Sequence, residues 1–370
     1  MDPLLFSPFS IRGLTLRNRI ILSPMLTYSA HDGHINEKHL AHYGKFAAGG
    51  AGLVFVESTK IDPDGRSTSH DPGLWDDKFI EPLSRVCGLV KELGASVGIQ
   101  LGHSGRKANR PLPWDQTGQG TATGAKRNDQ WELIAPSAIG HSERSAVPRE
   151  MTRDDISEIV AAFGKAASRA HRAGFDVLEI HGAHGYLIHQ FLSPVANQRT
   201  DSYGGTRENR MRFAIETAAR VRECWPQAKP LFFRISAEDD AGWDIEDSVA
   251  LARALKGLGV DVIDCSSGGI LTQASANNPV GYGYQVKYAD AIRKGADITT
   301  MAVGLITRAE QAEEILASGK ADLIALGREL LYNPNWPVHA AQALSVNNPY
   351  SMLPRNYEYW LEKRARGINP

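Results

Sequence analysis

A short stretch just past the middle of the chain gathers three side chains that could do chemistry. An apolar run at residues 177–180 ends abruptly in the sequence HGAHGY, which contains His181, His184 and Tyr186. Such an ending is typical of a buried strand that stops at a polar pocket. Residues three apart on a strand point to opposite faces, so the two histidines can share a target only if the backbone turns after Ile180. The intervening glycines allow that turn.

Two imidazoles and a phenol held together could bind a carbonyl or nitro oxygen, ligate a metal or move a proton. Taken singly, each histidine is more often a hydrogen-bonded packing residue. Their clustering with a tyrosine at a strand end instead favours a functional site. A metal site would need a third ligand, and Glu179 is the only carboxylate nearby in the sequence.

Two further polar side chains interrupt apolar runs. Arg234 lies within the sequence LFFRI at residues 231–235, and Gln100 lies within VGIQL at residues 97–101. A buried arginine needs an anionic or acceptor partner, and a buried amide needs hydrogen-bond partners. A bound cofactor would supply both.

The elements that must position these residues follow one repeated pattern, in which an apolar run ends at a glycine or a polar residue. Eight such runs lie at residues 19–22, 52–56, 96–101, 176–180, 230–235, 260–263, 298–303 and 322–326. Amphipathic helical patterns lie between them, clearest at residues 153–173, 208–224, 245–258 and 308–317. Thr152 and Thr307 are the expected N-caps of the first and last of these helices. Eight strands alternating with helices predict an α/β fold, the closed (β/α)8 TIM barrel. An open doubly wound sheet is the alternative, but no GxGxxG turn follows the first strand.

In such a barrel the catalytic groups lie at the carboxyl ends of the strands. This rule places nine residues around one pocket: Tyr28, Ser58, Gln100, His181, His184, Tyr186, Arg234, Gly304 and Arg328. Barrels often bind phosphate after strands seven and eight, where this chain has Gly304, Gly327 and Arg328. The residues together predict a phosphate at one end of a planar polar ligand, with the His/His/Tyr cluster over its other end.

Length and composition exclude several other classes of protein. The 370 residues carry a formal net charge of −1, which gives no case for nucleic acid or an anionic membrane surface as the main partner. Cys87, Cys224 and Cys265 are far apart and lack the spacing of a zinc or iron–sulfur site, so we expect reduced thiols. The N-terminal residues lack the features of a signal peptide, and no apolar run approaches the ~18 residues of a membrane helix. We therefore expect a soluble, cytoplasmic protein whose partners are a small molecule and other subunits.

We expect one barrel domain at residues 1–345 and a C-terminal tail at residues 346–370. A hairpin within residues 4–16 could cap the bottom of the barrel. The connection at residues 106–147 is too long for an ordinary loop and would lie on the active-site face, where it could cover a substrate. Aromatic residues in the tail, including Trp360, need burial against this barrel or a neighbouring subunit.

Five motifs resemble those of the old yellow enzyme family, in order along nearly the whole chain. They are SPM at residues 23–25, QLGHSGRK at 100–107, HGAHGY at 181–186, NQRTDSYGG at 197–205 and GRELL at 327–331. More narrowly, they resemble the thermophilic-like branch of that family, which includes the bacterial xenobiotic reductases. The resemblance implies a (β/α)8 barrel that carries non-covalent FMN, is reduced by NADPH or NADH, and reduces the activated C=C bonds of α,β-unsaturated carbonyl or nitro compounds.

The resemblance also implies a role for each matching residue. The isoalloxazine would lie against Pro24, Met25, Leu26, Ser58 and Gln100. Arg234 would face the N1 and C2 carbonyl edge, where its charge would stabilise the reduced flavin. The phosphate would be held by Gly304, Gly327 and Arg328. The substrate would be bound by His181, His184, Tyr186 and Tyr28, with Tyr186 delivering the proton to the α-carbon. Trp360 resembles an aromatic residue that enters the neighbouring subunit's pocket in some members, which implies a homodimer or homotetramer.

One position departs from the branch. Most members have a cysteine after the SPM motif, and this chain has Leu26. A leucine cannot donate a hydrogen bond to the flavin, so the flavin potential and the substrate preference do not carry over from the resemblance.

Three alternatives stay open at this point. The same residues could run the reaction in reverse, as a desaturase or oxidase of cyclic ketones with oxygen as acceptor. His181 and His184 could instead be ligands in a metal-dependent barrel lyase or hydrolase. The barrel could also bind a small molecule without catalysis.

Overall fold

The computed structural model describes residues 3–115, 131–273 and 278–368 of the chain. Eight strands form one closed barrel, in the order β3 (Ile20–Leu22), β4 (Leu53–Lys60), β5 (Ser96–Gly102), β8 (Val177–Gly182), β9 (Leu231–Ser236), β10 (Val262–Ser266), β11 (Thr299–Ala302) and β12 (Leu323–Leu326). Strand β12 pairs in parallel with β3 and closes the ring. The predicted (β/α)8 barrel is confirmed.

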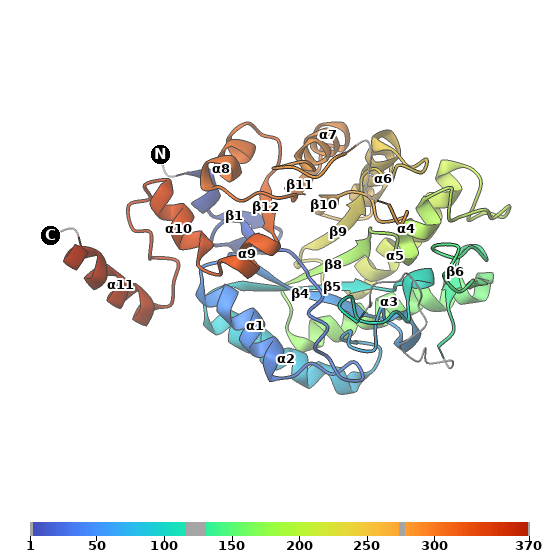
Figure 1. The fold of residues 1–370 in the computed structure, drawn as a ribbon, viewed down its shortest axis with the longest axis horizontal. Coiled ribbons are helices and arrows are strands. Elements are labelled where there is room, and N and C mark those ends of the chain that lie inside the picture. Colours follow the sequence, from blue (N-terminus) through green and yellow to red (C-terminus); the bar gives the residue numbers. More distant parts are fainter. Residues whose placement is uncertain (1–2, 116–130, 274–277, 369–370) are drawn as a thin grey trace.

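Helices surround this barrel (Figure 1). The longer ones are α1 (Glu37–Ala48), α2 (Ile80–Glu92), α3 (Arg153–Ala173), α5 (Arg207–Cys224), α6 (Ile245–Gly257), α7 (Val286–Ala296) and α8 (Ala309–Ala317). Shorter helices are α4 (Leu187–Leu192), α9 (Arg328–Tyr332) and α10 (Trp336–Ala343), and single 3-10 turns lie at Leu4–Phe6, Pro63–Gly65, Asp77–Phe79 and Gly105–Lys107. Among the described helices, none is long and apolar enough to cross a membrane.

The two predicted N-caps have different outcomes. Thr152 accepts a hydrogen bond from the backbone of Asp155, whose side chain bonds back to the Thr152 backbone, so α3 begins with a capping box. Thr307 is not a cap, and that prediction was wrong: α8 begins after Arg308, which makes no side-chain cap hydrogen bond. The backbone N–H of Thr307 instead donates to the side chain of Gln311 at 3.2 Å.

The N-terminal hairpin closes the amino end of the barrel, as expected. Strands β1 (Phe9–Ile11) and β2 (Leu14–Leu16) pair antiparallel. Apolar residues of the hairpin join one buried cluster with side chains from the barrel strands: Ile11, Leu16, Ile21, Leu53, Phe55, Val177, Phe232, Val262, Met301, Leu323 and Ala325. Arg12, at the turn, bonds to Asp261 and to the carbonyls of Gln227 and Gly259, which fastens the hairpin to the loops before β9 and β10.

An irregularity in β4 decides what this strand presents to the pocket. The pairing of β4 with β5 shifts between Val56 and Thr59, so two residues of β4 lie opposite Gln100. A bulge of this kind reverses which side chains face inward. Phe55 points into the core below the bulge, whereas Ser58 lines the pocket above it. Lys60, two residues after Ser58, donates its ammonium to the Ser58 hydroxyl behind the pocket lining. The predicted strand at residues 52–56 therefore ended four residues too early, because alternation cannot be followed through a bulge.

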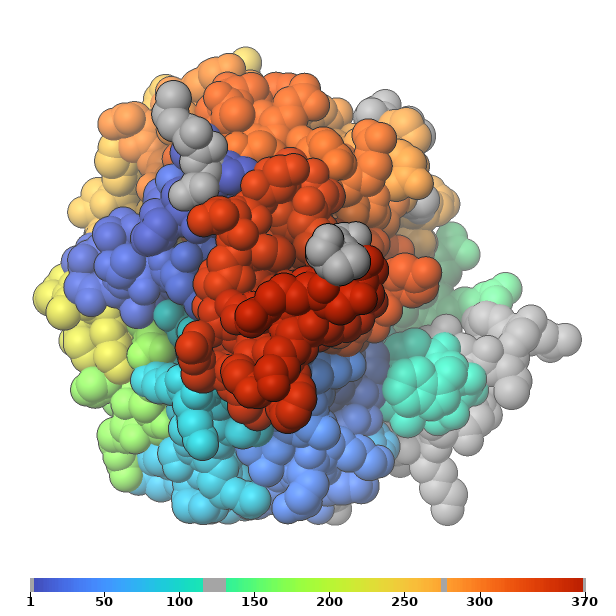
Figure 2. Space-filling model, turned by 90° about the vertical axis from the view of Figure 1, so that its left-hand side faces the viewer, coloured from blue at the N-terminus to red at the C-terminus, as the bar shows by residue number. Residues whose placement is uncertain are grey.

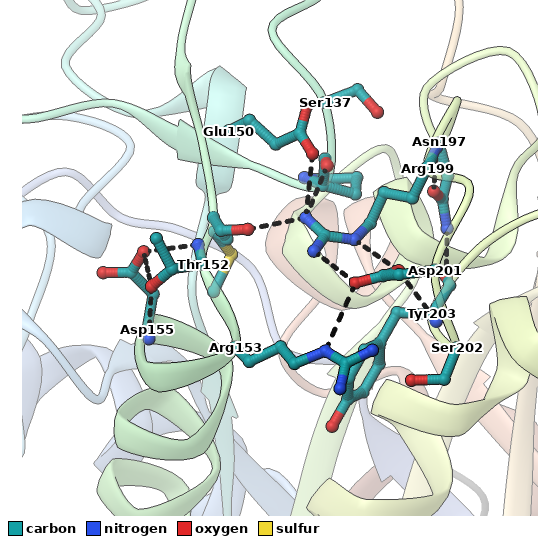
Figure 3. Close-up of polar contacts among 12 residues, drawn as sticks. Ser137, Glu150, Thr152, Arg153, Asp155, Asn197, Arg199, Asp201, Ser202 and Tyr203 are labelled. Atoms are coloured by element: carbon teal, nitrogen blue, oxygen red, sulfur yellow. Dashed lines mark hydrogen bonds and ion pairs between the residues drawn. The ribbon is translucent and has the colours of Figure 1, made fainter.

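The described parts of the long connection after β5 are fastened by Arg199, from the NQRTDSYGG motif. Its guanidinium donates to the carbonyls of Pro136 and Met151 and pairs with Asp201 (Figure 3). Residues of this connection also form the small parallel pair of β6 (Ile134–Ala135) and β7 (Arg149–Glu150). This motif thus has a structural role: it holds the returning chain against the start of α3.

The chain ends in helix α11 (Arg355–Ile368), which lies outside the barrel next to α10 (Figures 1 and 2). Its aromatic residues are exposed, with Trp360 at 65% of its surface. The three cysteines are free thiols; Cys87 and Cys265 are buried, and Cys224 is half-buried.

Candidate active site

One pocket lies at the carboxyl ends of the strands, with a cavity of about 200 Å³. Its lining comes from five consecutive parts of the barrel wall, from the segment after β3 round to β9. The lining residues are Pro24, Leu26, Tyr28, Ser58, Gln100, His181, His184, Tyr186 and Arg234. All nine were predicted as site residues from the sequence, and the fold brings them together.

The turn that gathers the histidines differs from the predicted one. Strand β8 continues through His181 to Gly182, so the turn comes after Gly182 and not after Ile180. His184 and Gly185 make the turn, with φ of 57° and 70°. A side chain at Gly185 would meet the carbonyl oxygen of Gly269 at 2.2 Å, so only glycine fits there.

His181, His184 and Tyr186 lie against one another. The ring centres of His181 and His184 are 5.2 Å apart, and Tyr186 meets the His181 ring edge-on at 4.9 Å. The Nε2 of His184 is 2.7 Å from the Ser266 hydroxyl, and its backbone N–H donates to Ser236. The cluster is therefore held by residues at the ends of β9 and β10.

Burial decides the protonation of this cluster. It lowers the pKa of His181 and of His184 well below the ordinary value, with neighbouring positive charges adding to the effect. Both imidazoles are thus neutral near pH 7, and each still donates one N–H. Burial and the nearby charge of Asp71 raise the pKa of Tyr186 to about 12, so its phenol keeps its proton.

The floor of the pocket is a buried network of charged and amide side chains. Gln100 donates to Glu179 at 2.8 Å, and Arg234 donates to Ser23 at 2.9 Å and lies 3.1 Å from Asp264. Burial raises the pKa of both carboxyl groups, for Glu179 with the added effect of Asp264. Glu179 and Asp264 also share a side-chain hydrogen bond. Within the described chain, Arg234 Nε and His181 Nδ1 have no hydrogen-bond partner. Such atoms at a pocket wall indicate a polar ligand.

Five predicted residues lie elsewhere. Met25 faces away from the pocket, toward Gly327. Gly304 and Gly327 follow the paired strands β11 and β12, and Arg328 is exposed at the first position of α9. Trp360 lines a separate groove between α10 and α11, of about 500 Å³.

Three charged residues near Tyr186 were not predicted. Lys60 Nζ lies 4.7 Å from the centre of the Tyr186 ring, and Lys107 Nζ lies 5.6 Å from it. Asp71 pairs with Lys60. Lys60 was missed because the bulge in β4 is not visible in the sequence, whereas Lys107 stands in the QLGHSGRK motif and could have been found there.

Comparison with known proteins identifies the family. The model of the NADH:flavin oxidoreductase / NADH oxidase family matches residues 4–347. The chain belongs to this family. Among curated relatives, the NADPH dehydrogenase of Geobacillus thermodenitrificans is 49% identical over 350 residues, which cover 94% of this chain and 96% of that protein. The NADPH dehydrogenase of Bacillus subtilis is 47% identical over 358 residues, covering 96% and 98%.

Solved structures of this family agree with the barrel. An old yellow enzyme homologue from Zymomonas mobilis has a TM-score of 0.76 at 28% identity and covers 92% of this chain and 93% of its own. Morphinone reductase has a TM-score of 0.77 at 26% identity, covering 93% and 90%. The resemblance to the old yellow enzyme family is confirmed, and with it a flavin-dependent oxidoreductase that uses FMN and a nicotinamide nucleotide.

The pocket of this flavin oxidoreductase fits a planar group with polar edges. The Gln100 amide and the Arg234 guanidinium present donors on one wall, and the Nε of Arg234 has no partner in the described chain. Leu26 and Pro24 offer apolar contact beside them. These are the groups that an isoalloxazine needs, because its ring is flat and its pyrimidine edge carries hydrogen-bond acceptors.

Proposed function

We propose that this protein reduces the activated C=C bonds of α,β-unsaturated carbonyl and nitro compounds, with NADPH as the reductant. The observation that carries the proposal is that His181, His184 and Tyr186, three hydrogen-bond donors whose rings lie together, line the same cavity as Gln100 and Arg234. The names of the Geobacillus and Bacillus relatives support NADPH as the nucleotide.

FMN, when bound, supplies the two-electron chemistry. We assign its ring to Pro24, Met25, Leu26, Ser58 and Gln100, its pyrimidine edge to Arg234, and its phosphate to Gly304, Gly327 and Arg328. Met25 packs against Gly327, where an added side chain would meet its sulfur at 3.2 Å, so it adjoins the end of the site assigned to the phosphate. Arg328 has no ion-pair or hydrogen-bond partner in the described chain, so its charge is available to an anion.

The histidines bind the electron-withdrawing oxygen of the substrate. Their low pKa keeps both imidazoles neutral, so binding a neutral carbonyl or nitro group requires no loss of a proton. Two N–H donors on one oxygen draw electrons from the conjugated C=C bond and leave its β-carbon electron-poor. Tyr186 then gives its proton to the α-carbon, for which a phenol is acidic enough because the carbanion formed there is far more basic than a phenolate.

Product analysis tests the proposal. The purified protein should show flavin absorption bands that NADPH bleaches under anaerobic conditions and that cyclohexenone restores, with cyclohexanone as the product. A protein that instead converts cyclohexanone to cyclohexenone with oxygen is the desaturase, which would use the same residues and for which Leu26 leaves room. A colourless protein that takes up no added FMN contradicts both functions.

Ligand titration tests the roles of the two histidines. Phenols mimic the oxygen of the substrate and give a charge-transfer band with oxidised flavin. We expect His181→Ala and His184→Ala each to weaken phenol binding by about tenfold or more, because hydrogen bonds to a buried oxygen are lost. FMN content should not change. Loss of FMN from either variant would mean that the histidines hold the cofactor and not the substrate.

We also propose that residues 346–370 form a subunit interface outside the barrel, in a homodimer or homotetramer. Helix α11 lies on the surface of the molecule (Figure 2). Its residues Tyr357, Tyr359 and Trp360 are 50%, 45% and 65% exposed, and clustered exposed aromatic side chains of this kind mark protein–protein contact sites. The proposal places Trp360 at the partner subunit's pocket. Light scattering should give an even number of subunits, and Trp360→Ala should weaken assembly or phenol binding; a monomeric wild-type protein contradicts the proposal.

A further inference from the structure

Lys60 is a fully buried lysine at the end of β4, beside Tyr186. Its side chain is 0% exposed, and its ammonium lies over the Tyr186 ring, 4.7 Å from the ring centre. Lysines are almost never fully buried unless paired, because taking an ammonium out of water costs several kcal/mol. The bulge in β4 is what turns this side chain toward the pocket.

Two polar groups hold the buried Lys60 ammonium beside the Tyr186 ring, and one of them is the carboxylate of Asp71. The ammonium donates to the pocket residue Ser58 at 3.0 Å and lies 3.6 Å from Asp71 Oδ2. Asp71 does not need the lysine for hydrogen bonding. Its two oxygens already accept bonds from the backbone and hydroxyl groups of Ser67 and Thr68, at 2.5–3.3 Å. The carboxylate is thus fixed by its own turn and serves as the counter-charge that keeps the ammonium in place.

We propose that Lys60 is a positioning residue for proton transfer, whose ammonium compensates the negative charge that Tyr186 acquires when it gives up its proton. This inference rests on the proposed role of Tyr186. In that step the O–H bond of Tyr186 breaks, a C–H bond forms at the α-carbon, and the electron pair stays on the phenolate oxygen. Water restores the proton after the product leaves.

Other charged and titratable groups face the Tyr186 phenol. They are Asp71, Arg110, Tyr28, His181 and Lys107. Lys107 also lies over the ring, and among residues 3–115, 131–273 and 278–368 its ammonium donates to the carbonyls of His184 and Gly269. Burial and two neighbouring arginines lower the pKa of Lys107 to about 7, so it is only partly charged at neutral pH. Burial lowers the pKa of Lys60, and the ion pair with Asp71 opposes that effect and favours the charged lysine. Arg110 also lowers the pKa of Tyr186, so substitution of Lys60 measures only the part that the lysine contributes.

Ionisation of the phenol tests this without any turnover. We would place 3,5-difluorotyrosine at position 186, because ring fluorines bring the phenol pKa into the range where the protein is folded, and follow it by fluorine NMR in the FMN-loaded protein. Lys60→Met should raise this pKa by about one or more, since an opposite charge within ~4–6 Å lowers a pKa by roughly 1–3. Lys60→Arg should restore it. Lys91→Met is the matched control. It removes a lysine of α2 that pairs with Asp176, and it should leave the pKa of the fluorinated phenol unchanged.

A second variant covers the case in which Lys60→Met fails to fold. The double variant Lys60→Met/Asp71→Asn removes both charges together and leaves no lone buried ion. Reoxidation of its reduced flavin by cyclohexenone should be slower than in the wild type by about tenfold, with reduction by NADPH unchanged. A phenol pKa that does not move in Lys60→Met, or a wild-type reoxidation rate in the double variant, overturns the proposal. Failure of the proposed function would show differently: the wild-type flavin would not be reoxidised by cyclohexenone, while the fluorine titration would still report on Lys60.

Discussion

The two ends of the barrel interior are built from opposite kinds of side chain. At the amino end, eleven apolar residues of the strands and the β1–β2 hairpin form a closed cluster without a charged member. At the carboxyl end, the same strands present Gln100, Glu179, Arg234 and Asp264, all buried. The change occurs within single strands: Val177 belongs to the apolar cluster, and Glu179, two residues later on the same face, belongs to the polar network.

This contrast shows how one barrel separates stability from chemistry. Apolar burial needs no partner, so the amino end stabilises the closed ring by itself. Buried polar atoms need partners, and at the carboxyl end some of them have none in the described chain, such as Arg234 Nε and His181 Nδ1. The polar end therefore gains its partners from what binds there. Substitutions at the two ends should consequently separate stability from turnover.

The largest effect should come from the carboxyl end. Tyr186→Phe removes the proposed proton donor but keeps the ring, so reoxidation of the reduced flavin by cyclohexenone should slow by about 10²–10⁴-fold. Reduction by NADPH and the midpoint of urea unfolding should stay near wild type, because no core contact is lost. Stopped-flow absorbance measures the two half-reactions separately: reduction of the flavin by NADPH and its reoxidation by cyclohexenone. Equal slowing of both half-reactions would mean that Tyr186 positions the cofactor and does not supply the proton.

The opposite result is expected at the amino end. Phe55 is fully buried, packs 5.8 Å from the Phe232 ring and lies against Gly98. Phe55→Ala should reduce the free energy of unfolding by about 3–5 kcal/mol through a cavity that neighbours cannot fill. Urea unfolding measures this, and the reoxidation rate at low temperature should be close to wild type. A folded variant with normal stability and slow turnover would contradict the division between the two ends.

Acid should destabilise the fold in part through a buried histidine at the carboxyl end. His103, after β5, is buried, and burial together with Lys60 lowers its pKa to about 3 from 6.5. Between these values the unfolded chain binds a proton that the folded chain does not, so stability falls as the pH falls from 6.5 toward 3. His103→Gln should reduce this loss by about 1.4 kcal/mol per pH unit, as urea unfolding at several pH values would measure. Phe55→Ala should keep the wild-type slope, because no titratable group belongs to its cluster.

Periodicity was enough to predict the barrel, and the rule that joins strand ends to active sites found seven of the nine residues that line the pocket. The other two, Pro24 and Leu26, came from the family resemblance, and Gly304 and Arg328, which the same rule had placed there, lie outside the pocket lining. Periodicity was not enough for side-chain direction. The bulge at Val56–Thr59 carried Lys60 into the site, and the turn came at His184 and not after Ile180. Nor could the sequence show that Glu179 on β8 and Asp264 on β10, on either side of β9, meet in one network. Bulges, and contacts between side chains of different strands, depend on how residues of neighbouring strands are aligned, and no local sequence pattern encodes that alignment.

The smallest effect should come from Leu26, the apolar side chain that lines the polar pocket. Leu26→Cys places a thiol, a weak hydrogen-bond donor, beside the assigned flavin position at the carboxyl end, where the leucine side chain has no donor. We expect a measurable shift of the flavin reduction potential in a spectroelectrochemical titration, with stability within about 1.5 kcal/mol of wild type. Leu26→Val is the matched control, since it shortens the side chain without adding a donor, and should leave the potential where it is. An unchanged potential in Leu26→Cys would mean that residue 26 shapes the substrate side of the pocket and does not influence the flavin, and the polar floor formed by Gln100 and Arg234 would then set the potential alone.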